Sequence, residues 1–262
     1  MDLGLQGARC IITGASDGIG AAAALAFGRE GAAVGLVARR RERLDAVAAQ
    51  AREAGAPKTA VVAADLADGE ALQDGLAELI DELGGIDVLV NNAGASRAGT
   101  IEQVDDDAWR ESFDLKLMGY VRSMRLVIPV MRAQGSGCIV NVLGVAGTHP
   151  SPNYVLSCFV TALQQLTASV ADQVAGDGIR VVGVGPGYTA TERVMTPIRR
   201  LAEERGVPVD DFVDVFAAEQ VPVGRLATAD EMATWITVMA SGIAGFVTGT
   251  QLLVDGGTSR AI

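Results

Sequence analysis

Residues 13–20 read TGASDGIG, and they join an apolar run, Arg9–Thr13, to an alanine-rich segment that begins at Ile19. The apolar run predicts a buried strand, and the alanine-rich segment predicts a helix. Glycines at positions 14, 18 and 20 keep side chains away from the start of that helix, where free N–H groups and the helix dipole attract phosphate. The alternative is a loop that only turns the chain, but the strand before it and the helix after it favour a dinucleotide site.

Short apolar runs and helical patterns alternate along the rest of the chain. Strands are expected at Arg9–Thr13, Ala33–Ala38, Thr59–Ala64, Val88–Asn91, Gly137–Val142, Ile179–Gly185 and Thr250–Val254. Helices are expected at Ile19–Glu30, Arg41–Ala54, Gly69–Leu83, Asp106–Ala133, Ser151–Val174 and Ala229–Ser241. The strands are apolar almost throughout, which is typical of strands covered on both faces. The strict alternation therefore predicts one parallel sheet with helices on both sides.

The composition excludes several classes of protein. The chain has 262 residues, 49% of them hydrophobic, and a net charge of −11. This charge argues against nucleic-acid binding, which needs a dense basic face. No apolar run reaches the ~18 residues of a membrane span, and the first residues lack the features of a signal peptide. Three widely spaced cysteines (Cys10, Cys138 and Cys158) are typical of free thiols in a reducing compartment. We therefore expect a cytoplasmic protein without a metal site.

Further motifs occur in a fixed order after the glycine loop. They are Ala64-Asp65-Leu66, Asn91-Asn92-Ala93-Gly94, Pro186-Gly187-Tyr188-Thr189-Ala190-Thr191, Pro222-Val223-Gly224-Arg225, Thr248-Gly249 and Asp255-Gly256-Gly257. Together with the Gly-x3-Gly-x-Gly spacing, they resemble the short-chain dehydrogenase/reductase family over residues 7–257. The resemblance implies an α/β fold: a single-domain, Rossmann-like, doubly wound parallel seven-stranded sheet with helices on both faces. It also implies one domain over residues 1–262, and a polar, irregular segment at about 189–223 is expected to be a substrate flap.

The resemblance also implies which residues bind a nicotinamide dinucleotide. They are Gly14, Ser16, Asp17, Gly18, Ile19, Gly20, Arg39, Arg40, Asp65, Leu66, Asn92, Ala93, Gly94, Pro186, Gly187, Thr189 and Thr191. Among them, Asp65 matches the acid that meets the adenine. Thr191 matches the position that binds the carboxamide.

The end of the second strand bears on the choice of dinucleotide. An acid there is typical of NAD sites, whereas the 2′-phosphate of NADP needs a cation. Here Arg39, Arg40 and Arg41 follow the strand, and a guanidinium can hold a phosphate with paired donors. The sequence thus favours NADP(H) over NAD(H), through Arg39 with Arg40 as a second candidate; the alternative is that these arginines begin a solvated helix. Asp17 either weakens 2′-phosphate binding or pairs with an arginine.

The catalytic residues depart from the family pattern. In the family, a tyrosine exchanges a proton with the substrate oxygen, assisted by a lysine four residues later, a preceding serine and an asparagine on the long helix before it. Tyr154 matches the tyrosine, at the start of an expected helix, but Cys158 stands at the lysine position and Lys116 at the asparagine position. No hydroxyl follows the Ile139–Val142 strand end directly, and Thr148 and Ser151 are candidates to replace the serine.

Lys116 is notable because only two of the 21 basic residues are lysines. A buried ammonium among leucines is costly unless it has a partner or a role. We therefore hypothesise that Lys116 is the relocated catalytic cation that assists Tyr154. The alternative is an ordinary helix lysine paired with Asp114 or another acid. Cys158 is expected to be a small buried thiol, and the single histidine, His149, either touches substrate or lies in a surface loop.

Two function classes remain open, and a third is less supported. The first is an NADP(H)-dependent oxidoreductase with an altered set of catalytic residues. The second is a cofactor-binding pseudoenzyme with a regulatory or assembly role. A non-redox use of the fold, such as lyase or dehalogenase chemistry, fits less well because the glycine loop is retained. The resemblance also implies a homodimer or homotetramer joined through two long helices, and flap residues Met195, Phe212, Val213 and Phe216 suggest an apolar substrate, although helix packing would explain them equally.

Overall fold

The computed structural model describes residues 2–94, 97–148 and 151–259, and these contain one seven-stranded parallel sheet. The strands are β1 (Arg9–Thr13), β2 (Ala33–Ala38), β3 (Thr59–Ala63), β4 (Val88–Asn91), β5 (Gly137–Val142), β6 (Ile179–Pro186) and β7 (Gln251–Val254). Their order, β3-β2-β1-β4-β5-β6-β7, reverses direction at β1 and β4. The doubly wound fold expected from the sequence is confirmed, with strand ends within one residue of the expected ones.

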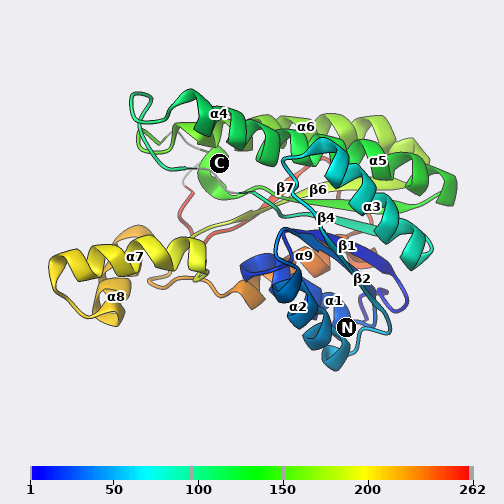
Figure 1. Cartoon of the computed structure of the whole chain (residues 1–262), viewed down its shortest axis with the longest axis horizontal. Coiled ribbons are helices and arrows are strands. Elements are labelled where there is room, and N and C mark those ends of the chain that lie inside the picture. Colours follow the sequence, from blue (N-terminus) through cyan, green and yellow to red (C-terminus); the bar gives the residue numbers. More distant parts are fainter. Residues whose placement is uncertain (1, 95–96, 149–150, 260–262) are drawn as a thin grey trace.

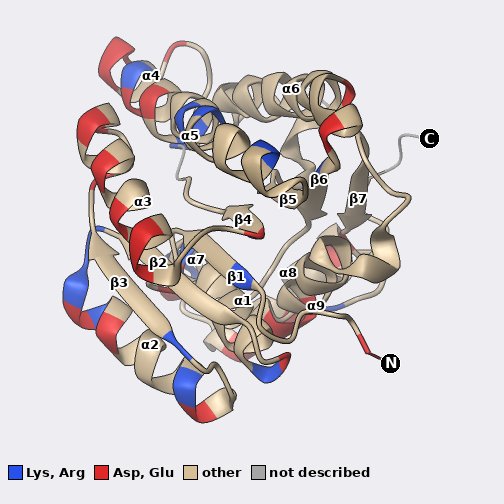
Figure 2. Ribbon diagram, turned by 90° about the vertical axis from the view of Figure 1, so that its right-hand side faces the viewer, with Lys and Arg blue, Asp and Glu red and all other residues tan. Residues whose placement is uncertain are grey.

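Helices cover both faces of this sheet (Figure 1). One face carries α1 (Gly18–Arg29), α2 (Arg41–Ala54) and α9 (Ala229–Ala240), and the other carries α3 (Gly69–Leu83), α5 (Gly119–Gln134) and α6 (Cys158–Val174). Strand side chains alternate between these layers: Cys10 and Ile12 pack under α1, whereas Ile11 packs on the opposite side. Charged residues gather on the outer faces of helices such as α2 and α3 (Figure 2). Both faces of each central strand are buried, which explains the continuous apolar runs.

The expected helix over Asp106–Ala133 is interrupted. The structure has α4 (Asp106–Ser112), then one π-helical turn at Phe113–Met118, then α5. The N–H of Gly119 donates to the carbonyl of Asp114, five residues back. A π turn inserted between two α-helices often marks a functional site. The two flanking helices bury different surfaces: Ala108 of α4 packs with Leu156, whereas α5 packs against the sheet.

The expected helix over Ser151–Val174 begins later than predicted. Tyr154 has a non-helical backbone (φ −149°, ψ 61°), a 3₁₀ turn follows at Val155–Ser157, and α6 begins at Cys158. Gly99 accounts for the delay: its N–H donates to the Asn153 carbonyl (2.8 Å), and its carbonyl accepts from the N–H of Val155 (3.3 Å). This long-range bridge holds Tyr154 outside the helix. Tyr154 is the N-cap of the 3₁₀ turn that leads into α6, and the expected beginning of the helix at Ser151 is wrong.

The segment after β6 is helical rather than irregular, which corrects the sequence expectation. Helices α7 (Glu192–Arg205) and α8 (Val209–Gln220) form a pair that projects from the sheet (Figure 1). The polar composition arises from their exposed faces. The apolar flap residues pack between the helices, around a buried core; they are Met195, Phe212, Val213 and Phe216, around Ile198, Ala217 and Leu226. Helix packing explains these residues, so they no longer indicate an apolar substrate.

Among the described residues, no helix combines the length and apolar character needed to cross a membrane.

Candidate active site

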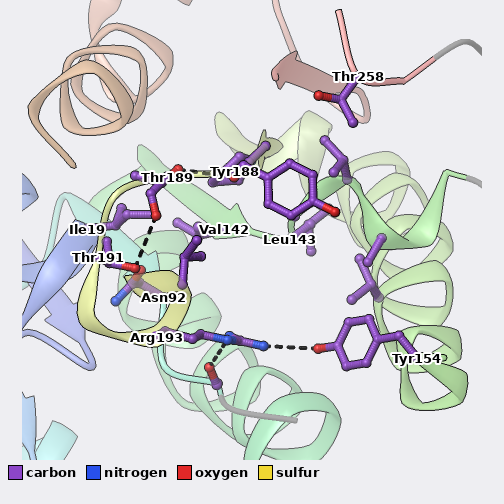
Figure 3. A pocket seen from close by; sticks show the side chains of 18 of the residues that line it. Ile19, Asn92, Val142, Leu143, Tyr154, Tyr188, Thr189, Thr191, Arg193 and Thr258 are labelled. Atoms are coloured by element: carbon purple, nitrogen blue, oxygen red, sulfur yellow. Dashed lines mark hydrogen bonds between the residues drawn. The ribbon is translucent and has the colours of Figure 1, made fainter. Parts of the chain in front are cut away.

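A cavity of about 370 Å³ opens at the carboxyl ends of the central strands. Gly94 follows β4, Val142 ends β5 and Pro186 ends β6, and all three line the cavity. Residues from the loop and first turn of α7 close one side (Figure 3). A crevice beside the point where strand order reverses is where doubly wound sheets bind ligands.

The glycine loop lies beside this cavity and is fixed to the loop after β4. The Thr13 hydroxyl accepts from the N–H groups of Asn92 (2.9 Å) and Ala93 (3.1 Å). The Asn92 amide donates to the carbonyls of Thr13 (3.1 Å) and Gly14 (3.2 Å). A Cβ on Gly14 would lie 2.8 Å from the Ala93 Cα, and a Cβ on Gly20 would collide with the Gly14 carbonyl. Only glycines fit here, so the backbone stays open at the N-terminus of α1, as a pyrophosphate requires.

Asp17 caps α1 and is paired with two arginines. Its carboxylate accepts from the N–H of Gly18 (2.7 Å) and lies 2.8 Å from Arg43 and 3.7 Å from Arg40. Arg40 also donates to the Ser16 hydroxyl (3.4 Å). Of the two alternatives for Asp17, the structure shows pairing with arginine. Sequence reasoning missed Arg43, although it lies one helical turn beyond Arg39 on a helix that begins with arginines.

The other expected cofactor residues divide into two groups. The cavity is lined by Ile19, Asn92, Gly94, Pro186, Gly187, Thr189 and Thr191. Asp65 and Leu66 lie after β3, outside the cavity lining. Asp65 is exposed and accepts from the N–H of Ala67 (3.0 Å), whereas Leu66 is buried in the core.

Lys116 is buried in the π turn and lines the cavity. Its ammonium donates to the Val142 carbonyl (2.9 Å) and to the Tyr120 hydroxyl (2.8 Å). Burial, and secondarily the charge of Arg193, lower the pKa of Lys116 from 10.5 to about 7. No described carboxylate pairs with it; Asp114 pairs with Arg122 instead (3.2 Å). Among the described residues, the structure therefore shows no acid paired with Lys116, contrary to the alternative that Asp114 or another acid pairs with it.

Gly94 makes room for this lysine. A Cβ at Gly94 would lie 2.5 Å from the Lys116 Cδ. The lysine stem thus occupies the space that any larger residue would need. The glycine of the Asn-Asn-Ala-Gly motif and Lys116 fit each other directly.

The Tyr154 hydroxyl is held by an arginine that sequence reasoning missed. Arg193 Nη2 donates to Tyr154 Oη (3.0 Å), and Arg193 Nη1 donates to the Gly94 carbonyl (2.8 Å; Figure 3). The signal available in the sequence was an arginine two residues after Thr191, directly behind a cofactor motif. The structure brings Tyr154 and Lys116 to one cavity, but the hydrogen bonds of Lys116 go to other partners.

The region after β5 corrects the expectation for Cys158. Cys158 is exposed rather than buried, and it lines a separate groove with Thr148. Val160, two residues later in α6, lines the cavity instead. Ser151 also lines the cavity, whereas the Thr148 hydroxyl donates to the Val145 carbonyl (2.7 Å). His149 lies outside the described residues.

Tyr188 is a second tyrosine in the cavity lining that was not singled out from the sequence. Its ring contacts Phe216 of α8 edge-on, with centroids 5.2 Å apart. The α7–α8 pair thus positions one wall of the cavity. In the part of the chain that the structure describes, no cluster of His, Cys, Asp or Glu could hold a metal ion.

A doubly wound sheet with a glycine loop at the N-terminus of its first helix defines a dinucleotide-binding protein. The family model for short chain dehydrogenase matches residues 8–200, and the chain belongs to that family. An uncharacterized oxidoreductase of Bacillus subtilis, YvrD, is 35% identical over 266 residues, covering 100% of both chains.

Two further relatives have named activities. The cis-4-hydroxycyclohexanecarboxylate dehydrogenase of Sinomonas cyclohexanicum is 38% identical over 255 residues, covering 94% of each chain. The crystal structure of L-sorbose reductase from Gluconobacter frateurii, complexed with NADPH and L-sorbose, superposes with a TM-score of 0.96. It is 32% identical, and the match covers 100% of both chains. The protein is thus an NAD(P)-dependent oxidoreductase of this family.

Proposed function

We propose that the protein transfers hydride between NADP(H) and the carbonyl or alcohol carbon of a small molecule, with Tyr154 as proton donor and acceptor. The observation that carries this proposal is the Tyr154 hydroxyl in the cavity beside the glycine loop, hydrogen-bonded to a guanidinium. The residues fit the cofactor, because the cradle at Gly14 and Gly20 excludes any Cβ.

The preference for NADP(H) is supported by three arginines near the start of α2. Arg40 and Arg43 surround Asp17 beside the Ser16 hydroxyl, and Arg39 is exposed next to them. Two guanidiniums offset the single carboxylate, so the group retains a net positive charge for a 2′-phosphate. Arginine is suited to this role because its planar donors can bind two phosphate oxygens at once.

The bound nicotinamide would supply or accept the hydride, and the chain's own residues handle the proton. In the reducing direction Tyr154 gives its hydroxyl proton to the substrate oxygen. Lys116 assists as a second cation in the same cavity. Its pKa of about 7 also lets it take up or release a proton at neutral pH. These roles follow from which side chains share the cavity.

We propose that the substrate is a small polar carbonyl compound or its alcohol. Hydroxyl groups of Ser151, Tyr188 and Thr258 line the cavity and can pair with substrate oxygens. The substrates named for two relatives, L-sorbose and cis-4-hydroxycyclohexanecarboxylate, are of this kind. The segment at about 189–223, which holds α7 and α8, would cover the bound substrate.

Localisation and oligomeric state are further parts of this proposal. The three cysteines are free thiols, which suits a cytoplasmic protein. We also propose a homodimer or homotetramer that joins through α5 and α6, because Ala162 and the partly exposed Phe159 and Leu166 leave apolar surface on α6.

The alternative is a pseudoenzyme that binds the cofactor without turnover. It is favoured by one observation: among the described residues, no lysine is hydrogen-bonded to Tyr154. The test is NADPH oxidation with a panel of ketones, aldehydes and sugars. Wild type is compared with Tyr154→Phe, and NADPH binding is measured by fluorescence as a control. Turnover lost in Tyr154→Phe with binding retained supports the enzyme; binding without any wild-type turnover supports the pseudoenzyme.

A further inference from the structure

The Arg193 guanidinium bridges two sides of the cavity. It stands in the first turn of α7, two residues after Thr191. One nitrogen donates to the Gly94 carbonyl (2.8 Å), which fixes the plane of the guanidinium. The other donates to Tyr154 Oη at 3.0 Å (Figure 3). The arginine thus contacts the atom that gives up the proton in the proposed reaction.

The charge of Arg193 is not neutralised by the residues around it. Elsewhere on α7, Arg199 pairs with Glu192 (2.7 Å) and Arg200 pairs with Glu204 (2.8 Å). Arg193 makes no ion pair with any described carboxylate, and no acidic residue lines the cavity over the described ranges. The charge of Arg193 also reaches Lys116, whose pKa it lowers in addition to the larger effect of burial.

Lys116 does not make this contact. Its ammonium is committed to the Val142 carbonyl and the Tyr120 hydroxyl, and it sits deeper, under Gly94. The two cations therefore differ in position. Lys116 supports the cavity from the π turn, whereas Arg193 touches Tyr154 directly.

We propose that Arg193 is a further catalytic residue, whose guanidinium stabilises the Tyr154 phenolate that forms when the substrate oxygen takes the hydroxyl proton. This inference rests on the proposed function. In reduction the carbonyl carbon receives the hydride from the dihydronicotinamide, and the carbonyl oxygen receives the proton from Tyr154. The phenolate then regains a proton from solvent. Arg193 keeps its own protons throughout, because a guanidinium is not deprotonated in proteins, and a charge-assisted hydrogen bond favours the anion.

The test uses the full chain with NADPH and the substrate panel. Arg193→Met removes the charge at similar length, and Arg193→Lys retains a cation. Arg199→Met is the matched control, because it removes an exposed guanidinium from the same helix. Removing one donor aimed at a developing oxyanion costs on the order of 100-fold in kcat. We expect that loss in Arg193→Met with KM and the NADPH Kd little changed, partial recovery in Arg193→Lys, and wild-type rates in Arg199→Met.

Chemical rescue separates catalysis from a structural role. Added methylguanidinium should restore part of the kcat of an Arg193→Ala variant, and should not restore Tyr154→Phe. Full turnover in Arg193→Met overturns the inference alone. So does a loss that appears only as weaker NADPH binding, since Arg193 would then hold the cofactor. Absence of turnover in wild type, with NADPH bound, refutes the proposed function and this inference with it.

Discussion

Replacing Lys116 by methionine should change how the stability of the fold depends on pH. The folded state holds Lys116 with a pKa of about 7, whereas the unfolded chain returns it to 10.5. Between these values the unfolded chain binds more protons than the folded one. Wild-type stability therefore rises with pH in this window, and the destabilising contribution is largest below pH 7. From pH 7 to pH 9 the gain from this one group is about 2 kcal/mol at ~1.4 kcal/mol per pKa unit.

Lys116→Met lacks this titration and keeps a side chain of similar length. The difference in unfolding free energy, wild type minus Lys116→Met, should therefore increase by about 2 kcal/mol between pH 7 and pH 9. Urea unfolding of the cofactor-free protein at several pH values measures it. The exposed Lys58→Met removes the only other lysine and serves as the control. A difference that stays constant from pH 7 to pH 9 would refute the account of Lys116 as a buried ammonium whose pKa is lowered by burial.

Three further predictions follow from other parts of the site. Arg40→Gln with Arg43→Gln should weaken NADPH binding by about 10-fold or more while NADH binding changes little, because charge-assisted bonds to the 2′-phosphate are lost; fluorescence titration measures both, with Arg52→Gln on the same helix as control. Gly94→Ala should cost about 1–3 kcal/mol of stability by overpacking against Lys116, and the cost should shrink in a Lys116→Ala background; additive effects in that double-mutant cycle would contradict the fit. Solution scattering should give the mass of a dimer or tetramer, and a monomer would end that proposal.

The fold could be predicted because its signals are local and repeated. Ile11 faces one helical layer while Cys10 and Ile12 face the other, so β1 had to be apolar at every central position. The glycine loop was equally predictable, because the requirement for an open backbone at Gly14 and Gly20 selects one residue type. The strand pattern follows from one pleated surface, and the glycine spacing was readable although the atoms that exclude a Cβ at Gly14 belong to the loop after β4.

The parts of the site that escaped prediction depend on contacts between distant segments. The non-helical backbone of Tyr154 coincides with a bridge to Gly99, 55 residues earlier in the sequence. α6 begins only after this bridge, at Cys158, and Val160 rather than Cys158 lies in the cavity wall. Arg193 contacts Tyr154 only because α7 folds back over the carboxyl end of β4. No local pattern encodes such contacts.

The positions of the two cations suggest how this active site works without a lysine on α6. Helix α6 begins four residues after Tyr154, and its residue in the cavity lining is the apolar Val160. The positive charge near the cavity instead comes from side chains on two other elements. The π turn brings in Lys116 from below, in the space that Gly94 leaves free, and α7 brings in Arg193 from the open side. Burial, and secondarily the charge of Arg193, lower the pKa of Lys116 to about 7, so this lysine can give up its proton near neutral pH. The guanidinium, which stays charged, is left as the partner of the phenolic oxygen.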